Sequence, residues 1–508
     1  MTKVKTLLIL LIFINLFLSA YWLLQGDIHY DVDVSRDFLV MDDIVKNNHF
    51  TLLGPHSGAI PGIFHGPLWF YINLPVFLIS GGNPLAIGWF WFGLSVIFLF
   101  IVFWVAKNLF GFKVALLSTL LFSVNSIVNS SIGLKNFYNP YGAVFLSPVF
   151  FWLFIKYITT TQFKYLIFTL FVLGLIIQFQ MAFGIPILFA ITLFLIYFAF
   201  KKQKLWHFFS YFILLIPLSS FIIFDLKHDG LQFRALVSYL SETGKISDNF
   251  IYILKMRINE LAFNFFDQLA PGKNIITVFY AAFFLILFPY ILRRCPDKEK
   301  VSYFLFGYLF LGFWIISLFF KGGLGNYFWP LLPLTIIIFC SFFNFIKREI
   351  FILVFLVLYL VNFYTGVSAI LDFKKDINQR GPHSWAFNLS VAKKIYEDAK
   401  GNFGYFTYSP DRFAYQQRYA MIYVKKYFPN IVSFPSEKKR LTYLIEVDPP
   451  QDRPELNGIS WRISDVRIDR QPDQTFRYDF IFVEKYLLNV EEIKIPANRY
   501  ILDFVFLR

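Results

Sequence analysis

Acidic residues are scarce in the first half of this 508-residue chain, and their placement is its most informative feature. Six aspartates lie between Asp27 and Asp43, and no aspartate or glutamate follows until Asp225. Charged residues make up only 16% of the chain, whereas 57% is hydrophobic and 21% is aromatic. A soluble domain of this length would carry more charge. The composition therefore excludes an ordinary soluble protein and indicates a polytopic membrane protein.

Cysteine is also rare. Cys295 lies in a basic loop and Cys340 in an apolar run, which excludes a disulfide framework and any zinc-type Cys/His spacing. The net charge of +14 arises largely from lysines and arginines in short loops between apolar runs. Membrane orientation explains this basic balance, so no nucleic-acid partner is implied.

Apolar runs long enough, or nearly long enough, to span a membrane recur along the first 370 residues. The eleven runs lie near 6–24, 85–106, 114–131, 139–156, 165–179, 185–200, 208–224, 274–292, 302–320, 328–346 and 350–369. The first run ends in Tyr21 and Trp22 instead of a small-residue cleavage site, so we expect an uncleaved helix.

Basic residues fall on one side of the membrane if these runs alternate across it. The opposite short loops hold little more than Lys135 and Lys321. The positive-inside rule then predicts a multi-pass plasma-membrane protein with its N-terminus inside and its C-terminus outside. The shorter run 67–80 contains Pro75, and counting it as a span would put the basic loops outside. We therefore expect an interfacial or re-entrant helix there.

Three external parts follow from this topology: 25–84, 225–272 and everything after about residue 371. Residues 371–508 hold 22 basic and 18 acidic side chains, as a soluble surface does. The predicted architecture is a membrane domain of residues 1–370 followed by an extracytoplasmic α/β domain of residues 371–508. Sequence patterns in the second domain predict strands at Phe403–Tyr408, Leu441–Val447, Phe476–Val483 and Tyr500–Leu507, and helices near Leu389–Ala399 and Arg412–Phe428.

The aspartates of the first external segment are candidate general bases. A helix from about Asp33 would put Asp33, Arg36 and Asp37 on one face. A carboxylate near headgroups and other carboxylates can have its pKa raised toward the working pH, which suits proton abstraction from a hydroxyl. The alternative is a solvated helix, and we expect this of Asp37, Asp42 and Asp43.

Other polar residues of the external segments could hold a phosphate or a metal. His65, at the mouth of the 67–80 helix, could donate to a phosphate oxygen, and His228 and Arg234 could hold a lipid phosphate. The alternative for His65 is an ordinary interfacial histidine, and the alternative for His228 and Arg234 is ordinary headgroup contact. Asp31-Val-Asp33 matches an Asp-x-Asp pattern; nucleotide sugars would lie on the wrong side of the membrane, but a divalent cation stays open as a cofactor. Lys135 and Asn139 lie in a further external turn.

Together these features resemble the GT-C glycosyltransferases, and most of all the bacterial relatives of protein O-mannosyltransferases and aminoarabinose transferases (family 39-like). The resemblance covers residues 1–370. It rests on the Asp-rich loop, on Gly66-Pro67-Leu68-Trp69 at the start of a juxtamembrane helix, and on the late soluble domain. It implies a polyprenyl-phosphate sugar donor, an acceptor hydroxyl on a protein, glycan or lipid, and an acidic base.

By register with that family the base falls on Asp33, with Asp31 next, and the other four aspartates are expected to be solvated. His65-Gly66-Pro67-Leu68 resembles the family's basic-Pro-Pro-Leu motif with glycine in second place. Asn139 stands where the family often has an acidic residue, and His228 and Arg234 match a subgroup pattern. The resemblance implies an inverting displacement in which His228, Arg234 and His65 or Lys135 hold the leaving phosphate.

Two other functions fit a membrane protein of this kind. A lipid-linked sugar transporter or flippase should carry ionisable residues inside its spans, and the apolar runs hold almost none. A non-catalytic anchor for residues 371–508 would need far fewer spans. The sequence therefore favours the transferase over both.

Overall fold

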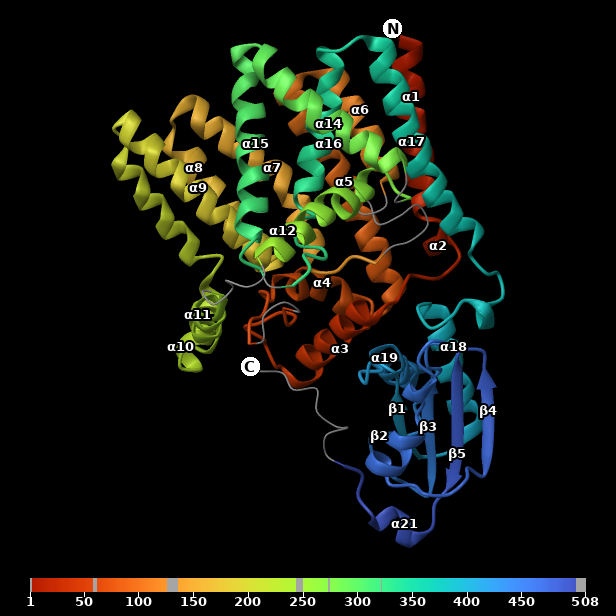
Figure 1. Cartoon of the computed structure of the whole chain (residues 1–508). Coiled ribbons are helices and arrows are strands. Elements are labelled where there is room, and N and C mark those ends of the chain that lie inside the picture. Colours follow the sequence, from red (N-terminus) through yellow and green to blue (C-terminus); the bar gives the residue numbers. More distant parts are fainter. Residues whose placement is uncertain are drawn as a thin grey trace.

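The computed structural model describes residues 2–57, 62–125, 136–243, 250–272, 275–320 and 322–498. These residues form a mostly helical body with one small sheet near the C-terminus (Figure 1). Lys135 and the predicted strand Tyr500–Leu507 lie outside the described residues.

Every one of the eleven apolar runs contains a helix. The helices are α1 (Thr2–Ser19) with α2 (Tyr21–Leu24), α5 (Pro84–Phe110), α6 (Phe112–Val124), α7 (Pro140–Thr160), α8 (Phe163–Phe179), α9 (Met181–Lys202), the 3-10 helix η1 (Leu205–Leu215) with α10 (Ser219–Lys227), α14 (Ile275–Arg294), α15 (Asp297–Ser317), α16 (Leu331–Ser341) with η4 (Phe342–Asn344), and α17 (Arg348–Leu371). Pro84 and Pro140 stand at the first position of α5 and α7, where the missing N–H costs nothing.

Six of the described helices are long and apolar enough to cross a membrane, namely α5, α7, α9, α14, α15 and α17. A seventh span results if η1 and α10, which meet at an angle of 65°, are counted as one. The helices α4, α6, α8 and α16 with η4 are apolar but shorter. Length and composition thus support six or seven spans, and the full count of eleven stays a prediction.

Basic segments that were predicted to share one side of the membrane lie together. The Nζ atom of Lys5 lies 4.9 Å from the ring centroid of Phe112, and that of Lys113 lies 5.8 Å from the ring centroid of Phe343. These contacts join the start of α1, the start of α6 and η4. Figure 1 shows the start of α1 at the opposite end of the helical body from the sheet. The number of crossings and the membrane side of each end stay predictions.

The two external segments between the apolar runs are also helical. The first forms α3 (Val32–Asn47) and α4 (Leu68–Ile79), which lie between the helical body and the sheet (Figure 1). The second forms α11 (Leu231–Thr243), α12 (Phe250–Asn259), the π-helix η3 (Glu260–Phe265) and α13 (Phe266–Leu269). At 12 residues α4 is too short for a full crossing, which needs about 20 residues.

The sheet has five strands in the order β2-β1-β3-β5-β4. The strands are β1 (Phe403–Tyr408), β2 (Ser433–Pro435), β3 (Leu441–Val447), β4 (Gln474–Tyr478) and β5 (Ile481–Leu487). β1 pairs in parallel with β2 and β3, whereas β5 pairs antiparallel with β3 and β4. The predicted strands at β1 and β3 are confirmed. The single strand predicted over Phe476–Val483 is wrong, because the chain reverses at Asp479, whose φ is +47°.

Helices and short turns complete the C-terminal part. They are η5 (Ile377–Gln379), α18 (Trp385–Ala399), α19 (Tyr415–Val424), η6 (Lys425–Tyr427), η7 (Pro454–Leu456), α20 (Ile459–Trp461), the π-helix η8 (Arg462–Val466) and α21 (Val490–Lys494). The helices predicted near Leu389–Ala399 and Arg412–Phe428 correspond to α18 and α19.

Aromatic contacts fasten α3 to the C-terminal part. The ring centroids of Phe38 and Tyr419 lie 5.1 Å apart, and those of Tyr30 and Trp385 lie 5.2 Å apart. The hydroxyl of Tyr419 also donates to the carbonyl oxygen of Gly82 at 2.5 Å. Each buried aromatic pair contributes about 0.5–1.5 kcal/mol beyond the area it buries. The helices α18 and α19 of the C-terminal part are therefore packed directly against the Asp-rich segment.

Candidate functional site

Asp31 begins helix α3 and has both carboxylate oxygens engaged. Its Oδ1 accepts from the backbone N–H of Val34 at 2.9 Å, and its Oδ2 accepts from the side-chain amide of Asn136 at 3.2 Å. An aspartate in this N-cap position stabilises a helix by about 1 kcal/mol. Asp31 thus joins α3 to the turn that precedes α7.

Arg36 lies between Asp33 and Asp37, as the helical spacing predicts. Its Nη1 is 2.5 Å from Oδ1 of Asp33, and its Nε and Nη2 are 3.1 and 2.7 Å from Oδ1 of Asp37. The side chain of Asp33 is 49% exposed, and no described residue donates to its Oδ2. Asp33 is therefore a fixed carboxylate with one oxygen open to a ligand.

Asp37 is buried, which corrects the prediction that it is a solvated residue. Only 4% of it is exposed, and its Oδ2 has no hydrogen-bond partner among the described residues. Burial raises the pKa of Asp37 to about 7 despite the attraction of Arg36, and the nearby Asp33 and Asp31 add repulsion. Asp27 is buried too, because it pairs with the C-terminal part. Neither residue belongs to a solvated helix face.

A cavity of about 800 Å³ lies between this segment and the C-terminal part. Helix α3 contributes Arg36 to the wall. Asp33 is not in the wall itself, but it is hydrogen-bonded to this arginine. The remaining wall residues are Val40, which is also on α3, 51 and 53–56 from the chain after α3, Phe64 and Phe70, and residues 407–408, 412–413, 415, 418, 455–457, 460–461, 464–465 and 498 from the C-terminal part. This volume lies within the range of small-ligand sites.

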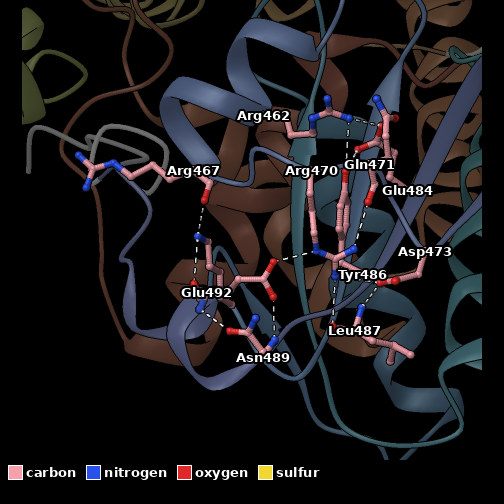
Figure 2. A network of polar contacts seen from close by, with 11 residues as sticks. Arg462, Arg467, Arg470, Gln471, Asp473, Glu484, Tyr486, Leu487, Asn489 and Glu492 are labelled. Carbon is pink, nitrogen blue, oxygen red and sulfur yellow. Dashed lines mark hydrogen bonds and ion pairs between the residues drawn. The ribbon is translucent and has the colours of Figure 1, made fainter.

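The part of the wall formed by Trp461 and Ser464 is held to the sheet by a polar network (Figure 2). Nη1 of Arg462 is 2.9 Å from Oε1 of Glu484 on β5, and Tyr486 donates to Oε2 of the same carboxylate at 2.6 Å. Arg470 bonds both Asp473 and Glu492 further along the network (Figure 2). Because most of its donors and acceptors are paired with one another, with the buried Nε of Arg462 as an exception among the described residues, we interpret this cluster as a structural support.

His65 is buried beside the cavity and is not part of its wall. The backbone N–H of Met181 donates to its Nδ1 at 3.4 Å. Burial and the nearby Arg36 lower the pKa of His65 to about 3, so its ring is neutral near pH 7. A neutral ring with Nδ1 as acceptor carries its proton on Nε2. The ring can donate one hydrogen bond to a ligand but supplies no positive charge.

Gly66 explains why the motif at this point has glycine and not proline. A Cβ atom at Gly66 would lie 1.7 Å from Oε1 of Gln178, and the Gly66 N–H donates to the carbonyl oxygen of Gln178 at 2.8 Å. Proline would clash and would also lose this donor. The close approach thus ties the start of α4 to the end of α8.

The remaining predicted substrate-binding residues that the structure describes, Asn139, His228 and Arg234, do not line the cavity. Asn139 is buried and donates to the carbonyl oxygen of Phe179 at 2.8 Å, which is a structural contact. The ring of His228 stacks on Phe224, and its Nδ1 lies 2.9 Å from the Phe224 carbonyl oxygen. Arg234 is exposed on α11. The segment formed by α10 and α11 contacts the loop beside the cavity, because the side chain of Gln232 accepts a hydrogen bond from the N–H of Phe64 at 3.0 Å.

Metal-ligating side chains do not cluster within the described parts of the chain. No group of three His, Cys, Asp or Glu residues there is arranged to hold a metal ion. The expectation of a divalent cation therefore gains no support from Asp31 and Asp33, whose described partners are Val34, Asn136 and Arg36.

Several residues of the site could not be identified from the sequence. Arg412 and Arg418 lie in a segment whose pattern indicated only a helix, yet both line the cavity. Asp37 looked like any solvated carboxylate of an amphipathic helix. The only available signal was the Asp-Arg-Asp spacing around Arg36, which indicated the shared face but not which acid is buried.

No protein-family model and no curated protein match this sequence. Solved structures do resemble its fold. The apo structure of ArnT from Cupriavidus metallidurans superposes with a TM-score of 0.60 at 8% identity, covering 95% of this chain and 98% of that one. The same protein bound to undecaprenyl phosphate gives 0.58 at 9% identity with equal coverage. The chain therefore has a GT-C fold, in agreement with the resemblance seen in the sequence.

A weaker likeness extends to a second solved protein. The oligosaccharyltransferase of Archaeoglobus fulgidus, in complex with zinc and sulfate, gives a TM-score of 0.47 at 11% identity, covering 86% of this chain and 68% of that one.

Proposed function

We propose that this protein is a membrane glycosyltransferase that moves a sugar from a polyprenyl-phosphate donor to an acceptor hydroxyl at the extracytoplasmic face. The observation that carries the proposal is the half-exposed Asp33, held by Arg36 at the edge of a ligand-sized cavity, within a GT-C fold. The ArnT structure with undecaprenyl phosphate supports a polyprenyl-phosphate-linked donor.

The chemistry is an inverting displacement. The acceptor oxygen attacks the anomeric carbon while the bond from that carbon to the phosphate oxygen breaks. Asp33 takes the hydroxyl proton, and polyprenyl phosphate leaves with the bonding electrons. Because phosphate is stable as an anion, no general acid is needed, and one carboxylate suffices.

The geometry favours Asp33 over Asp31 as the base. Both oxygens of Asp31 already accept hydrogen bonds from Val34 and Asn136, whereas only one oxygen of Asp33 is engaged. Because Arg36 fixes the Asp33 carboxylate in advance, less entropy is lost when this carboxylate is positioned in the transition state. His65 Nε2–H, His228 and Arg234 are candidates for holding the leaving phosphate, together with Lys135.

The test is the release of polyprenyl phosphate by purified full-length protein supplied with a membrane lipid extract. Asp33→Asn should reduce the rate at least 100-fold, the usual contribution of a general base. Asp31→Asn keeps a good N-cap residue, so a comparable loss there would assign the base to Asp31 instead. Asp43→Asn, on the same helix, is the matched control.

Full activity of both the Asp33→Asn and Asp31→Asn proteins would refute the proposed base. Movement of the donor lipid across proteoliposomes without release of polyprenyl phosphate would refute glycosyl transfer altogether and favour a transporter.

A further inference from the structure

Arg36 is held along one edge by Asp37 and reaches Asp33 from its end. Its Nε and Nη2 both bond Oδ1 of Asp37, at 3.1 and 2.7 Å, whereas its Nη1 bonds Oδ1 of Asp33 at 2.5 Å. Nε and Nη2 lie on the same edge of the planar guanidinium group, whose donors form a rigid fork. The two bonds to Asp37 therefore fix the direction in which Nη1 points.

The pairing of Arg36 with Asp37 is not a by-product of helical spacing. Asp33 and Arg36 are three positions apart on α3, so they face each other as such pairs do on many helices. Arg36 and Asp37 are adjacent, and adjacent side chains of a helix do not face each other. Their contact therefore depends on the surroundings that bury Asp37.

The carboxyl group of Asp37 is costly where it stands. Its side chain is 6% exposed, against 49% for that of Asp33, and its Oδ2 has no hydrogen-bond partner among the described residues. Because burial raises the pKa of Asp37 to about 7, the folded protein pays for this carboxylate at neutral pH. An apolar side chain of similar size would avoid that cost. The contribution of Asp37 therefore lies in something other than stability.

The contribution becomes clear from what Arg36 would do without Asp37. Its Nε–Nη2 edge would then have no bond to any described residue. A guanidinium with a free edge pairs with a carboxylate through two parallel bonds, one to each oxygen. Such a pair would occupy both oxygens of Asp33, including the Oδ2 to which no described residue donates. No oxygen of Asp33 would then be open to the proton of a hydroxyl.

We propose that Asp37 is a positioning residue for the base. It holds the Nε–Nη2 edge of Arg36, limits this arginine to a single bond with Asp33, and so keeps Oδ2 of Asp33 free for the acceptor hydroxyl. The inference rests on the proposed function, in which Asp33 takes the hydroxyl proton. Asp37 itself touches neither the donor nor the acceptor and acts only through Arg36.

The kinetics of polyprenyl phosphate release from a membrane lipid extract test this role. Asp37→Leu should lower kcat at least about 10-fold, with little change in the KM for the extract, because a displaced base affects the transition state more than binding. Asp37→Asn should recover most of the loss, since its amide oxygen can still accept from both N–H groups. Adding Asp37→Leu to the Asp33→Asn protein should have almost no further effect. The matched control is Asp42→Leu, which removes another aspartate of α3, one that bonds Lys46.

Chemical labelling tests the same contact without turnover. The purified full-length protein is treated with a water-soluble carbodiimide and glycine ethyl ester, and peptide mass spectrometry measures the rate of modification at Asp33. Asp37→Leu should slow this modification at least about 5-fold, because the freed edge of Arg36 bonds both oxygens of the Asp33 carboxylate. Asp37→Asn and Asp42→Leu should leave the labelling rate at Asp33 close to that of the unmodified protein.

The outcomes separate this proposal from the proposed function. An unchanged kcat in Asp37→Leu, equal losses in Asp37→Leu and Asp37→Asn, an undiminished loss in the Asp33→Asn protein, or an unchanged labelling rate overturns the role of Asp37. If no protein releases polyprenyl phosphate but the labelling difference remains, the proposed function fails and the positioning of the Asp33 carboxylate stands. Asp37→Ala lacks the same acceptor oxygens and replaces Asp37→Leu if thermal unfolding shows that the leucine variant does not fold.

Discussion

Asp27 and Arg380, which are 353 positions apart in the sequence, form a buried ion pair of 3.2 Å. The same Oδ2 of Asp27 accepts from Oγ of Ser384 at 2.5 Å, and its Oδ1 accepts from the N–H of Ala386 at 3.0 Å. One carboxylate therefore binds the chain after the first helix to the start of the C-terminal part. The cavity also lies between the aspartate-rich segment and the C-terminal part, although none of these four residues lines it.

Removing the Asp27 carboxylate should destabilise the protein strongly. In Asp27→Ala the guanidinium of Arg380 and the donors of Ser384 and Ala386 lose their buried partner. Breaking a buried pair in this way costs about 3–5 kcal/mol. Thermal unfolding in detergent should show this loss, and limited proteolysis should cut the chain between α17 and α18 faster. The control is Asp42→Ala, which breaks the more exposed pair with Lys46 at 2.8 Å and should cost at most about 1 kcal/mol. Equal losses of unfolding free energy in the two variants would show that the Asp27–Arg380 pair does not hold the two parts of the chain together.

The elements that sequence patterns predicted best are those fixed by local chemistry. Long apolar runs gave helices in all eleven places, and the alternating pattern of Leu441–Val447 gave β3, because hydrophobic periodicity acts within a few residues. The pattern failed at Phe476–Val483, since alternation continues through a tight turn at Asp479. The antiparallel pairing of Tyr478 with Ile481 and the φ of +47° at Asp479 show two strands and not one.

The parts of the site that the sequence could not provide depend on distant partners. Asp27 and Asp42 look alike within the aspartate cluster, yet one is buried by Arg380 and Ser384 and the other pairs with Lys46 on the same helix. Arg418 likewise becomes a cavity residue only when α19 packs against α3. The aspartate cluster indicated the location of the site, and tertiary contacts decided the role of each member.

The buried carboxyl of Asp37 predicts a specific pH dependence of stability. Its pKa is raised to about 7 in the folded protein, from an ordinary value of 3.8. Between these values the unfolded chain releases the proton and the folded protein keeps it. The stability that Asp37 contributes is therefore full below pH 3.8 and is lost as pH rises toward 7, by up to about 1.4 kcal/mol per pH unit.

Replacing Asp37 by Asn should remove this dependence. Between pH 5 and pH 7 the unfolding free energy of the unmodified protein should fall, relative to that of Asp37→Asn, by roughly 2–3 kcal/mol. Thermal unfolding of both proteins in detergent across pH 5–8 measures the difference, with Asp43→Asn as the control. Parallel pH profiles for the unmodified and Asp37→Asn proteins would show that Asp37 is ionised throughout this range.

Gly66 should not tolerate a larger residue. In Gly66→Ala the new Cβ would lie 1.7 Å from Oε1 and 3.0 Å from Cα of Gln178, so either the side chain or the backbone must move. Overpacking of this kind costs about 1–3 kcal/mol. Gly66→Pro should be worse, because it also removes the N–H that donates to Gln178. The combination Gly66→Ala/Gln178→Ala removes the side-chain clash only. A double-mutant cycle of unfolding free energies should therefore show partial recovery, and strict additivity would contradict the clash.

Arg257 and Glu260 form a buried pair that should control the turn at 322–330. Arg257 donates to the carbonyl oxygens of Ser317, Phe320 and Gly322, and Glu260 accepts from the N–H of Leu324 at 2.7 Å. That turn carries Asn326, which accepts from the side chain of Gln180 at 3.0 Å.

A lysine at position 257 keeps the charge but lacks the planar fork that serves several carbonyls at once. Arg257→Lys should lower the unfolding free energy by about 2–4 kcal/mol, because buried acceptors lose their donors. It should also reduce the rate of polyprenyl phosphate release, since the turn packs beside the Gln180 end of α9. Thermal unfolding and the release assay measure the two effects. Arg348→Lys, an exposed arginine at the start of α17, is the control, and an unchanged unfolding temperature in Arg257→Lys would show that the pair does not hold the turn.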